Sequence, residues 1–417
     1  MNFSTPLKPS SAKIPSKSAK IIIVGGGIVG LSVARELLVQ NPDLKVLLLE
    51  KENQIALHQT GHNSGVIHSG IYYPADSDKA AGCREGIRLL GEFCDRNKIQ
   101  RKRVGKVIVA TSQEELPALE KLYRQGIANQ ILGLRMIEPE ELREIEPAVS
   151  GLRALHLPEV SLINFREVAK SLKDELVAAG GTVGLHNKVR IISLAKDEIT
   201  VATENEEYHG DYLINCGGLY CDKLAKLAGS EVPVRIIPFR GEYFTLRPEI
   251  AQRIRGLVYP VPDPRFPFLG VHLTPTLEGE VTAGPNAVLA LAREGYRWRK
   301  INFREVIEYL SYGGFWRMAF KYWNTGIFET ARSLMKPLYA NSIRKFLPDL
   351  KSSDLIPDGS GVRAQAVNAK GELIHDFLYV KQPRAIHILN APSPAATASL
   401  AIAQRIVSLI KEENLWP

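Results

Sequence analysis

The sequence has 417 residues, of which 45% are hydrophobic and 24% are charged, and its formal net charge is +8. These values are ordinary for a globular protein, and the length exceeds what one core usually supports, so we expect two domains. No run approaches the roughly 18 uninterrupted apolar residues of a membrane-spanning helix. Residues 1–20 lack the apolar core of a secretory signal and are rich in Ser, Pro and Lys, so we expect a disordered extension and a cytoplasmic protein.

A strand followed by a glycine-rich turn opens the rest of the chain. Residues 21–24 are four consecutive β-branched residues, typical of a strand buried on both faces. Gly25, Gly27 and Gly30 then fit the pattern G-x-G-x-x-G, in which glycines allow the tight turn, the approach of a pyrophosphate and close helix packing. A second strand ends at Glu50, whose carboxylate would accept hydrogen bonds from ribose hydroxyls. This order favours a dinucleotide-binding βαβ unit over a generic one.

A stretch of small residues with three histidines follows at residues 57–73. His58, His62 and His68 lie among glycines and serines, which let the backbone come close to a flat ligand. We therefore expect this stretch to contact the ligand and not to form a simple surface loop.

The middle of the chain alternates helices and strands. Between residues 113 and 150 helix and loop alternate. Helices are predicted at 79–97 and 164–179, and strands at 104–111, 182–185, 189–194, 199–202 and 211–218, of which the last ends in glycines.

The second half changes character. Prolines punctuate residues 233–290, where short strands at 241–246, 257–259 and 268–273 indicate an antiparallel sheet and a second domain. Residues 293–350 are helical, aromatic and basic. At 385–397 an apolar strand runs into a Pro/Ser turn and a helix of small residues, which offers a second helix N-terminus to a ligand.

The cysteines give no sign of a metal site. Cys83, Cys94, Cys216 and Cys221 form no C-x-x-C pair, and no pair of histidines has zinc-ligand spacing. We expect reduced thiols and no metal.

Several longer strings carry a resemblance to a known family. They lie at residues 58–73 (HQTGHNSGVIHSGIYY), 240–243 (RGEY), 259–264 (YPVPDP), 268–272 (FLGVH), 284–287 (GPNA) and 390–397 (NAPSPAAT). With the glycine motif, they make the chain similar to flavoproteins of the D-amino-acid-oxidase/glycine-oxidase superfamily. Within it, the chain most closely resembles the L-2-hydroxyglutarate dehydrogenase/oxidase family, over residues 21–405.

The resemblance implies FAD as cofactor and oxidation of L-2-hydroxyglutarate to 2-oxoglutarate, with hydride transfer from C2 to flavin N5. It also implies an α/β fold in which a Rossmann-like FAD-binding domain (21–105, 151–232 and 357–417) is interleaved with an antiparallel-sheet substrate domain (106–150 and 233–356). Only one dinucleotide motif follows a strand, so electrons should leave for a quinone, another acceptor or dioxygen. The cofactor-binding residues expected are Gly25, Gly26, Gly27, Ile28, Gly30, Glu50, Lys51, Thr60, His62, Asn63, Ser64, Gly65, Val189, Cys216, Gly217, Ser393, Ala395, Ala396 and Thr397.

The substrate has two carboxylates, which guanidinium groups hold well. By its position in the superfamily, Arg363 corresponds to the arginine that grips the α-carboxylate; a surface salt bridge is the alternative. Arg240 and Arg265 are candidates for the distal carboxylate, and Tyr259 is a further substrate-binding candidate.

The reaction needs a base for the hydroxyl proton, and a histidine suits this role near neutral pH. His68 lies in the small-residue stretch, His272 on a strand expected above the flavin, and His375 after an apolar pair typical of a core position. We favour His272 as the base, with His68 positioning the flavin or the substrate, but the sequence leaves the choice open.

Three other functions are compatible with parts of the sequence. A flavin amine oxidase of the glycine-oxidase kind needs one carboxylate-binding arginine. The net charge and the basic, aromatic segment would suit a nucleic-acid-binding flavoprotein, yet no nucleic-acid fold signature is present, so we expect no nucleic-acid partner. A redox-sensing module without turnover would leave the histidine-rich stretch unexplained.

Residues 293–345 predict docking on the inner face of an anionic membrane. This segment has eleven Lys or Arg against four acidic residues, and Trp316, Phe320 and Trp323 are spaced as on one helical face. Aromatic rings beside basic residues are typical of interfacial helices. The alternative is that the aromatic stripe packs into the substrate domain.

Overall fold

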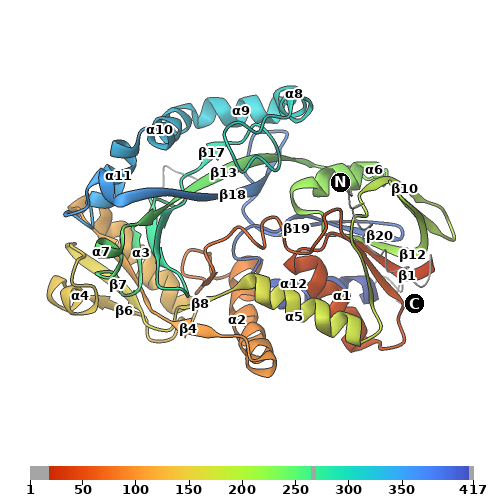
Figure 1. Ribbon diagram of the computed structural model, residues 1–417, viewed down its shortest axis with the longest axis horizontal. Coiled ribbons are helices and arrows are strands. Elements are labelled where there is room, and N and C mark those ends of the chain that lie inside the picture. The colour runs from red at the N-terminus through yellow and green to blue at the C-terminus, as the bar shows by residue number, and fades with distance from the viewer. Residues whose placement is uncertain (1–17, 264–268, 413–417) are drawn as a thin grey trace, which may run out of the picture.

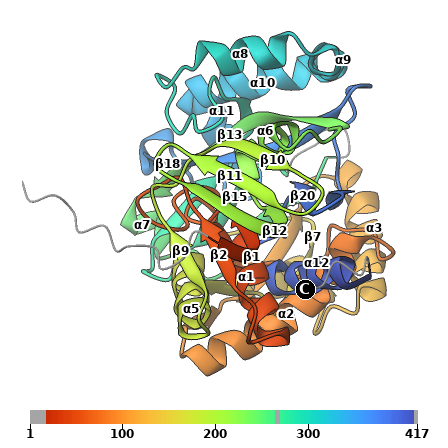
Figure 2. The same ribbon diagram turned by 90° about the vertical axis from the view of Figure 1, so that its right-hand side faces the viewer.

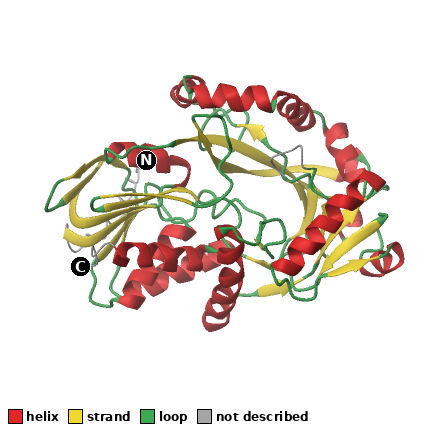
Figure 3. Cartoon of the chain, turned by 180° about the vertical axis from the view of Figure 1, so that it is seen from behind, coloured by secondary structure: helices red, strands yellow, loops and turns green. Residues whose placement is uncertain are grey.

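The computed structural model describes residues 18–263 and 269–412, and it contains two large β-sheets with helices along their outer sides (Figure 1). Loops gather in the middle of the molecule, between the two sheets (Figure 3). This α/β arrangement confirms the predicted fold class.

The first sheet is built around the predicted N-terminal strand. Its order is β10-β11-β12-β1-β2-β9, with β20 on β12 and β19 on β20. The strands are β1 (Ser18–Val24), β2 (Val46–Leu49), β9 (Thr182–Gly184), β10 (Val189–Leu194), β11 (Ile199–Thr203), β12 (Glu207–Asn215), β19 (Leu378–Gln382) and β20 (Ala385–Asn390). Strand β1 runs parallel to β2 and β12, and Ile21, Ile22 and Ile23 are fully buried, as expected of a central parallel strand.

The N-terminal boundary differs from the prediction. Ser18 and Ala19 already pair with His209 and Gly210 of β12, so the disordered extension predicted over residues 1–20 is three residues too long at its end. The polar sequence around Ser18 does not predict a strand, because this segment pairs with β12 through backbone hydrogen bonds.

Four helices cover one face of the first sheet, at the bottom of Figure 1. They are α1 (Ile28–Gln40), α2 (Asp78–Asn97), α5 (Phe165–Ala178) and α12 (Ser399–Glu412). The helices predicted at 79–97 and 164–179 are thus confirmed as α2 and α5. Their N-caps are Ser77, which accepts a hydrogen bond from the backbone N–H of Ala80, and Asn164, which accepts one from that of Arg166.

The second sheet is mixed, not purely antiparallel. Its order is β17-β13-β16-β15-β14-β5-β7-β6, with β18 on β13, and β5 and β14 are parallel neighbours. The strands are β5 (Lys106–Ala110), β6 (Arg135–Ile137), β7 (Arg153–Leu157), β13 (Val234–Leu246), β14 (Leu257–Pro260), β15 (His272–Pro275), β16 (Val281–Gly284), β17 (Val288–Leu289) and β18 (Leu355–Asn368). Short helices α3 (Leu116–Ala128), α4 (Pro139–Ile145) and α7 (Pro248–Ala251) flank it, and α6 (Cys221–Leu227) follows β12.

Two strands that fall in the predicted FAD-binding segments belong to the second sheet. Strand β7 falls in the predicted FAD-binding segment 151–232, and most of β18 falls in 357–417, yet both pair within the second sheet. Strand patterns in the sequence show that a segment is extended but not which sheet it joins. A third, small sheet of β3 (Val66–Ile67), β8 (Ser161–Ile163) and β4 (Arg101–Arg103) lies beside both.

Helices α8 (Phe303–Leu310), α9 (Gly313–Lys321), α10 (Trp323–Leu334) and α11 (Lys336–Arg344) run over the second sheet, far from α1, α2 and α5 (Figure 2). Residues 293–302 precede them without helical structure, contrary to the prediction. Trp316, Phe320 and Trp323 do not lie on one helix, because α9 ends at Lys321 and α10 begins at Trp323.

The aromatic residues at 316, 320 and 323 are nevertheless exposed, whereas Tyr309, Phe315 and Tyr339 of these helices are buried. Phe320 is 74% exposed and Trp323 is 58% exposed, so they do not pack into a core. Not all of the positive charge reaches the surface, since Arg293 and Arg332 are buried in ion pairs with Asp222 and Glu329. Among the described residues, no helix combines the length and the apolar character needed to cross a bilayer.

Candidate active site

A cavity of about 1600 Å³ lies between the two sheets and receives residues from both. It brings together segments that are far apart in the sequence: the turn after β1, the small-residue stretch, the ends of β12 and β20, and β18. The predicted site residues that line it are Gly25, Gly27, Ile28, Glu50, Lys51, Thr60, His62, Asn63, Ser64, His68, Val189, Cys216, Gly217, Tyr259, His272, Arg363, Ser393, Ala395 and Ala396. His375, the third candidate base, is exposed where it lines the cavity.

Four predicted cofactor residues support the cavity wall without lining it. The backbone N–H of Gly26 donates to Glu50 Oε2 at 2.7 Å, and the hydroxyl of Thr397 accepts from the backbone N–H of His68 at 3.1 Å. Gly30 and Gly65 lie where a side chain would meet a backbone carbonyl. These residues hold the shape of the site.

The three positions of the motif require glycine for different structural reasons. Gly25 has a φ of +117°, and a Cβ there would overlap with the carbonyl of Cys216; a Cβ at Gly30 would overlap with the carbonyl of Gly25. At Gly27 a Cβ would meet only the Thr60 hydroxyl, at 3.4 Å, and the residue lines the cavity. Two glycines are therefore required by the protein's own packing, whereas Gly27 leaves room for a ligand.

The start of helix α1 faces the same part of the cavity. Gly27 is its N-cap, and the first helical residue, Ile28, lines the cavity beside Glu50. A helix N-terminus attracts the negative charge of a phosphate. The open glycine, the helix N-terminus and the carboxylate at the end of β2 fit a dinucleotide such as FAD.

Arg363, on β18, lines the part of the cavity that the second sheet forms. It lies directly across from Phe239 of β13, so it shares a sheet face with Gly241 and Tyr243, which also line the cavity. Burial lowers the pKa of Arg363, and the nearby Tyr243 and Glu329 act in the other direction. Its place in the cavity wall favours a ligand-binding role over the surface salt bridge considered from the sequence.

Arg240 is not in the cavity, contrary to the prediction. Its register partner is one residue away from that of Arg363, so its side chain points to the other face of the sheet. There it is 2% exposed, with its guanidinium 4.0 Å from the ring centroid of Trp298 and 3.3 Å from Glu242 Oε1. Arg265, the other candidate for the distal carboxylate, lies outside the described residues.

Two neutral histidines, His68 and His272, line the same cavity as Arg363. His272 is 5% exposed, stacks on Tyr259 with 3.8 Å between ring centroids, and makes a 2.9 Å hydrogen bond from Nδ1 to the carbonyl of Gly270. Because a carbonyl can only accept, Nδ1 carries the proton and Nε2 has a free lone pair. Burial, together with the nearby positive charges of Lys106 and Arg363, lowers the pKa of both His68 and His272 to about 3.

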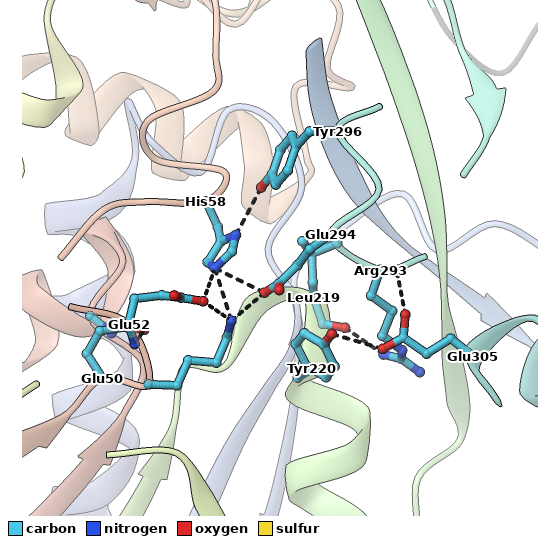
Figure 4. A network of polar contacts seen from close by, with 11 residues as sticks. Glu50, Glu52, His58, Leu219, Tyr220, Arg293, Glu294, Tyr296 and Glu305 are labelled. Atoms are coloured by element: carbon cyan, nitrogen blue, oxygen red, sulfur yellow. Dashed lines mark hydrogen bonds and ion pairs between the residues drawn. The ribbon is translucent and has the colours of Figure 1, made fainter. Parts of the chain in front are cut away.

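A polar network closes one side of the cavity (Figure 4). Lys51 and His58, from the segment after β2, meet Glu294: Lys51 Nζ lies 2.6 Å and His58 Nε2 lies 3.0 Å from Glu294 Oε1. Glu52 contacts both basic residues, and the Tyr296 hydroxyl lies 3.1 Å from His58 Nδ1. The network ties the first half of the chain to the segment before α8.

This network has the composition of a metal site but already contains a cation. Glu52, His58 and Glu294 could together hold a metal ion by their spacing. The ammonium of Lys51 lies between the two carboxylates and supplies the positive charge. Burial would raise the pKa of Glu294, but hydrogen bonds and charge from His58 and Lys51 lower it to about 2.

Sequence reasoning missed several residues of the site. Tyr72, Tyr243 and Lys79 line the cavity, and Lys106 is buried behind it with its ammonium against the rings of Tyr72 and Tyr259. Tyr72 and Tyr243 fall within the family-like strings, which was a signal available for them. The sequence offers no such signal for Lys106, because a lysine before an apolar strand usually marks a solvated strand end.

Comparisons with known proteins show the family to which the chain belongs. The model of the FAD-dependent oxidoreductase (DAO) family matches residues 20–409. L-2-hydroxyglutarate dehydrogenase from Indibacter alkaliphilus is 46% identical over 92% of this chain and 96% of its own length. The human mitochondrial L-2-hydroxyglutarate dehydrogenase is 41% identical over 98% and 92%, and that of Escherichia coli K12 is 44% identical over 94% and 92%.

The chain belongs to the L-2-hydroxyglutarate dehydrogenase family. It is therefore an FAD-dependent oxidoreductase, as the resemblance implied. The fold of the family is also seen in L-α-glycerophosphate oxidase from Mycoplasma pneumoniae with FAD bound, with a TM-score of 0.77, 24% identity, and coverage of 94% of this chain and 95% of that one. Glycine oxidase from Geobacillus kaustophilus shares the fold with a TM-score of 0.70, 16% identity and coverage of 95% of each chain.

Proposed function

We propose that this chain oxidises L-2-hydroxyglutarate to 2-oxoglutarate, with FAD and the substrate held in the single cavity between the sheets. The names of its close relatives support this reaction. The observation that carries the proposal is that Arg363, His68 and His272 line the same cavity as the open Gly27 turn. A carboxylate-binding group and proton acceptors thus lie within reach of a cofactor site.

Arg363 holds the C1 carboxylate of the substrate. A planar guanidinium can donate two parallel hydrogen bonds to a carboxylate, which fixes both the position and the orientation of the neighbouring C2 carbon. Its location on β18, a long strand paired along β13, makes it a rigid anchor.

His272 takes the proton of the C2 hydroxyl on Nε2. The hydrogen bond from Nδ1 to Gly270 fixes the tautomer that leaves Nε2 as the acceptor. When bound, FAD supplies the acceptor for the two electrons of the C2–H bond. His68, whose backbone is held by Thr397, positions the substrate from the small-residue stretch.

The assignment of the base is tested by two matched variants, His272→Gln and His68→Gln. We expect His272→Gln to lower kcat by ~10²–10⁴-fold, the usual contribution of a general base. His68→Gln should raise KM more than it lowers kcat. The reverse pattern would make His68 the base.

The reaction itself is tested with the flavin-loaded protein and an artificial electron acceptor. We expect 2-oxoglutarate to form from L-2-hydroxyglutarate in amounts equal to the acceptor reduced. Glycine serves as the alternative substrate, since oxidation of glycine without oxidation of L-2-hydroxyglutarate would identify an amine oxidase instead.

We further propose that electrons leave for a membrane quinone, with helices α8–α10 docked on an anionic bilayer. Large apolar side chains project from all three helices: Phe303 is 74% exposed, Phe320 74% and Ile327 62%. Basic residues are exposed beside them, namely Arg297, Arg299, Lys300, Arg304, Arg317 and Lys321. Rings at headgroup depth and cations near anionic lipid favour such binding.

Liposome co-sedimentation tests the docking. The protein should bind vesicles containing anionic lipid at low salt, bind neutral vesicles less, and lose binding when Phe303 and Phe320 are both changed to Ser. Leu132→Ser, which removes a side chain of similar exposure (75%) outside α8–α10, is the control and should leave binding unchanged. Equal binding to both kinds of vesicle, or to neither, would contradict the proposal.

A further inference from the structure

A lysine is buried in the second sheet next to the substrate end of the cavity. Lys106 is the first residue of β5 and pairs with Leu157 of β7 and Leu257 of β14, so strands flank it on both sides. The residue is 4% exposed. Buried lysines are rare unless a carboxylate accompanies them.

The immediate neighbours of this lysine are aromatic rings. Lys106 Nζ lies 3.6 Å from the ring centroid of Tyr259 and 4.4 Å from that of Tyr72, and both tyrosines line the cavity. Within the described residues, Lys106 makes no ion pair with a carboxylate. The π-faces of two rings only partly compensate a buried ammonium, and burial lowers the pKa of Lys106 well below its usual value.

A second polar group without a partner lies beside it. The hydroxyl oxygen of Tyr72 is buried and has no hydrogen-bond partner among the described residues. A buried polar group left without a partner costs stability. An ammonium group that lies against ring faces and a hydroxyl without a partner therefore meet at one corner of the cavity.

This corner lies near the groups that act on the substrate. The charge of Lys106 lowers the pKa of His68 and that of His272, which places it close to both candidate bases. Tyr259, against which the ammonium rests, stacks on His272.

We propose that Lys106 and Tyr72 form the subsite for the distal carboxylate of the substrate. This inference rests on the proposed function, in which Arg363 holds the C1 carboxylate. A dicarboxylate then brings the negative charge that Lys106 lacks and the acceptor oxygen that the Tyr72 hydroxyl lacks. Arg240 does not fill this role, because it points to the other face of the sheet.

The subsite predicts selectivity between two unreactive ligands. Glutarate carries both carboxylates, whereas butyrate lacks the distal one, and the binding of each is followed by the change in the flavin absorbance spectrum. Lys106→Met, which keeps the unbranched stem and removes the charge, should raise the Kd of glutarate by ~30-fold or more, a typical loss for a charge-assisted hydrogen bond. The Kd of butyrate should change by less than ~3-fold, since it makes no such bond.

Two further variants make the test decisive. Tyr72→Phe removes only one hydroxyl and should raise the Kd of glutarate by ~3-fold or more while leaving that of butyrate unchanged. If Lys106→Met does not fold with flavin, the glutarate and butyrate affinities of Tyr72→Phe decide the question. Lys102→Met, the same substitution at an exposed lysine on β4, should change neither value.

An equal loss of affinity for glutarate and butyrate would overturn the subsite. That result differs from a failure of the proposed function, which would appear as wild-type protein that does not oxidise L-2-hydroxyglutarate. Wild-type turnover combined with non-selective variants would therefore reject the subsite alone.

Discussion

The two ends of the cavity are formed by different kinds of residue. The cofactor end consists mainly of backbone and small residues in a few short stretches, in which Gly27 opens the turn and Glu50 ends the next strand. The substrate end consists of large side chains from separate strands, with Arg363 on β18 and His272 on β15 in its lining and Lys106 on β5 buried behind it. In the proposed function, local backbone geometry binds the dinucleotide, whereas the substrate is recognised by an arrangement that exists only in the folded sheet.

The largest expected effect is at the cofactor end. Gly27→Val should give protein without flavin, because the added side chain enters the space for the pyrophosphate while meeting only Thr60 of the protein. The flavin content is measured from the absorbance of the purified protein. Gly326→Val, at an exposed glycine with no atom within 4 Å of the added Cβ, is the control and should stay yellow. A fully flavin-loaded Gly27→Val would place the pyrophosphate elsewhere.

At the substrate end we expect a smaller and purely kinetic effect. Arg363→Lys keeps the charge but loses the planar pair of donors, so kcat/KM for L-2-hydroxyglutarate should fall by more than ~tenfold, or ~1.4 kcal/mol of transition-state stabilisation. The flavin content should be unchanged, which separates this end of the cavity from the other. Unchanged kinetics would remove Arg363 from the site.

The polar network of Lys51, His58 and Glu294 should give the smallest effect, and one that depends on pH. The pKa of Glu294 is lowered to about 2, so its stabilising contribution is present above its unfolded value of 4.5 and is lost as the pH falls toward 2. In His58 burial lowers the pKa but Glu294 raises it, with a net rise above 6.5, so its contribution is present below 6.5 and is lost as the pH rises through the folded value.

Thermal melting of wild type and Glu294→Gln across this range measures that contribution. The variant should be destabilised by about 1 kcal/mol between pH 4.5 and 6.5, and by less on either side. A difference that does not change with pH would show that the network contributes through packing and not through charge.

The contrast between the two ends also explains what the sequence could predict. The positions of the Gly25–Gly30 turn and of Glu50 were predictable, because both belong to one local βαβ unit in which the sequence spacing determines the geometry. Arg363 was placed only by family resemblance. Arg240 was misplaced because strand residues alternate between faces, and only the register of β13 with β18 shows that Gly241 and Tyr243, not Arg240, face the cavity.

Other errors have the same origin in tertiary structure. Lys106 was overlooked, since nothing local distinguishes a lysine buried between two strands from one at a solvated strand end. The aromatic residues at 316, 320 and 323 were assigned to one helix, but the helix breaks between α9 and α10. The exposure of their side chains, which the docking proposal needs, comes from the packing of these helices over the second sheet.

Anaerobic mixing reveals whether this cavity oxidises L-2-hydroxyglutarate. The flavin-loaded protein is mixed with each enantiomer of 2-hydroxyglutarate while the flavin absorbance near its long-wavelength maximum is recorded. We predict that the L-enantiomer bleaches the flavin and yields one 2-oxoglutarate per flavin, whereas the D-enantiomer leaves it oxidised. A flavin that stays oxidised with the L-enantiomer, or that is bleached by the D-enantiomer instead, would rule out the proposed reaction.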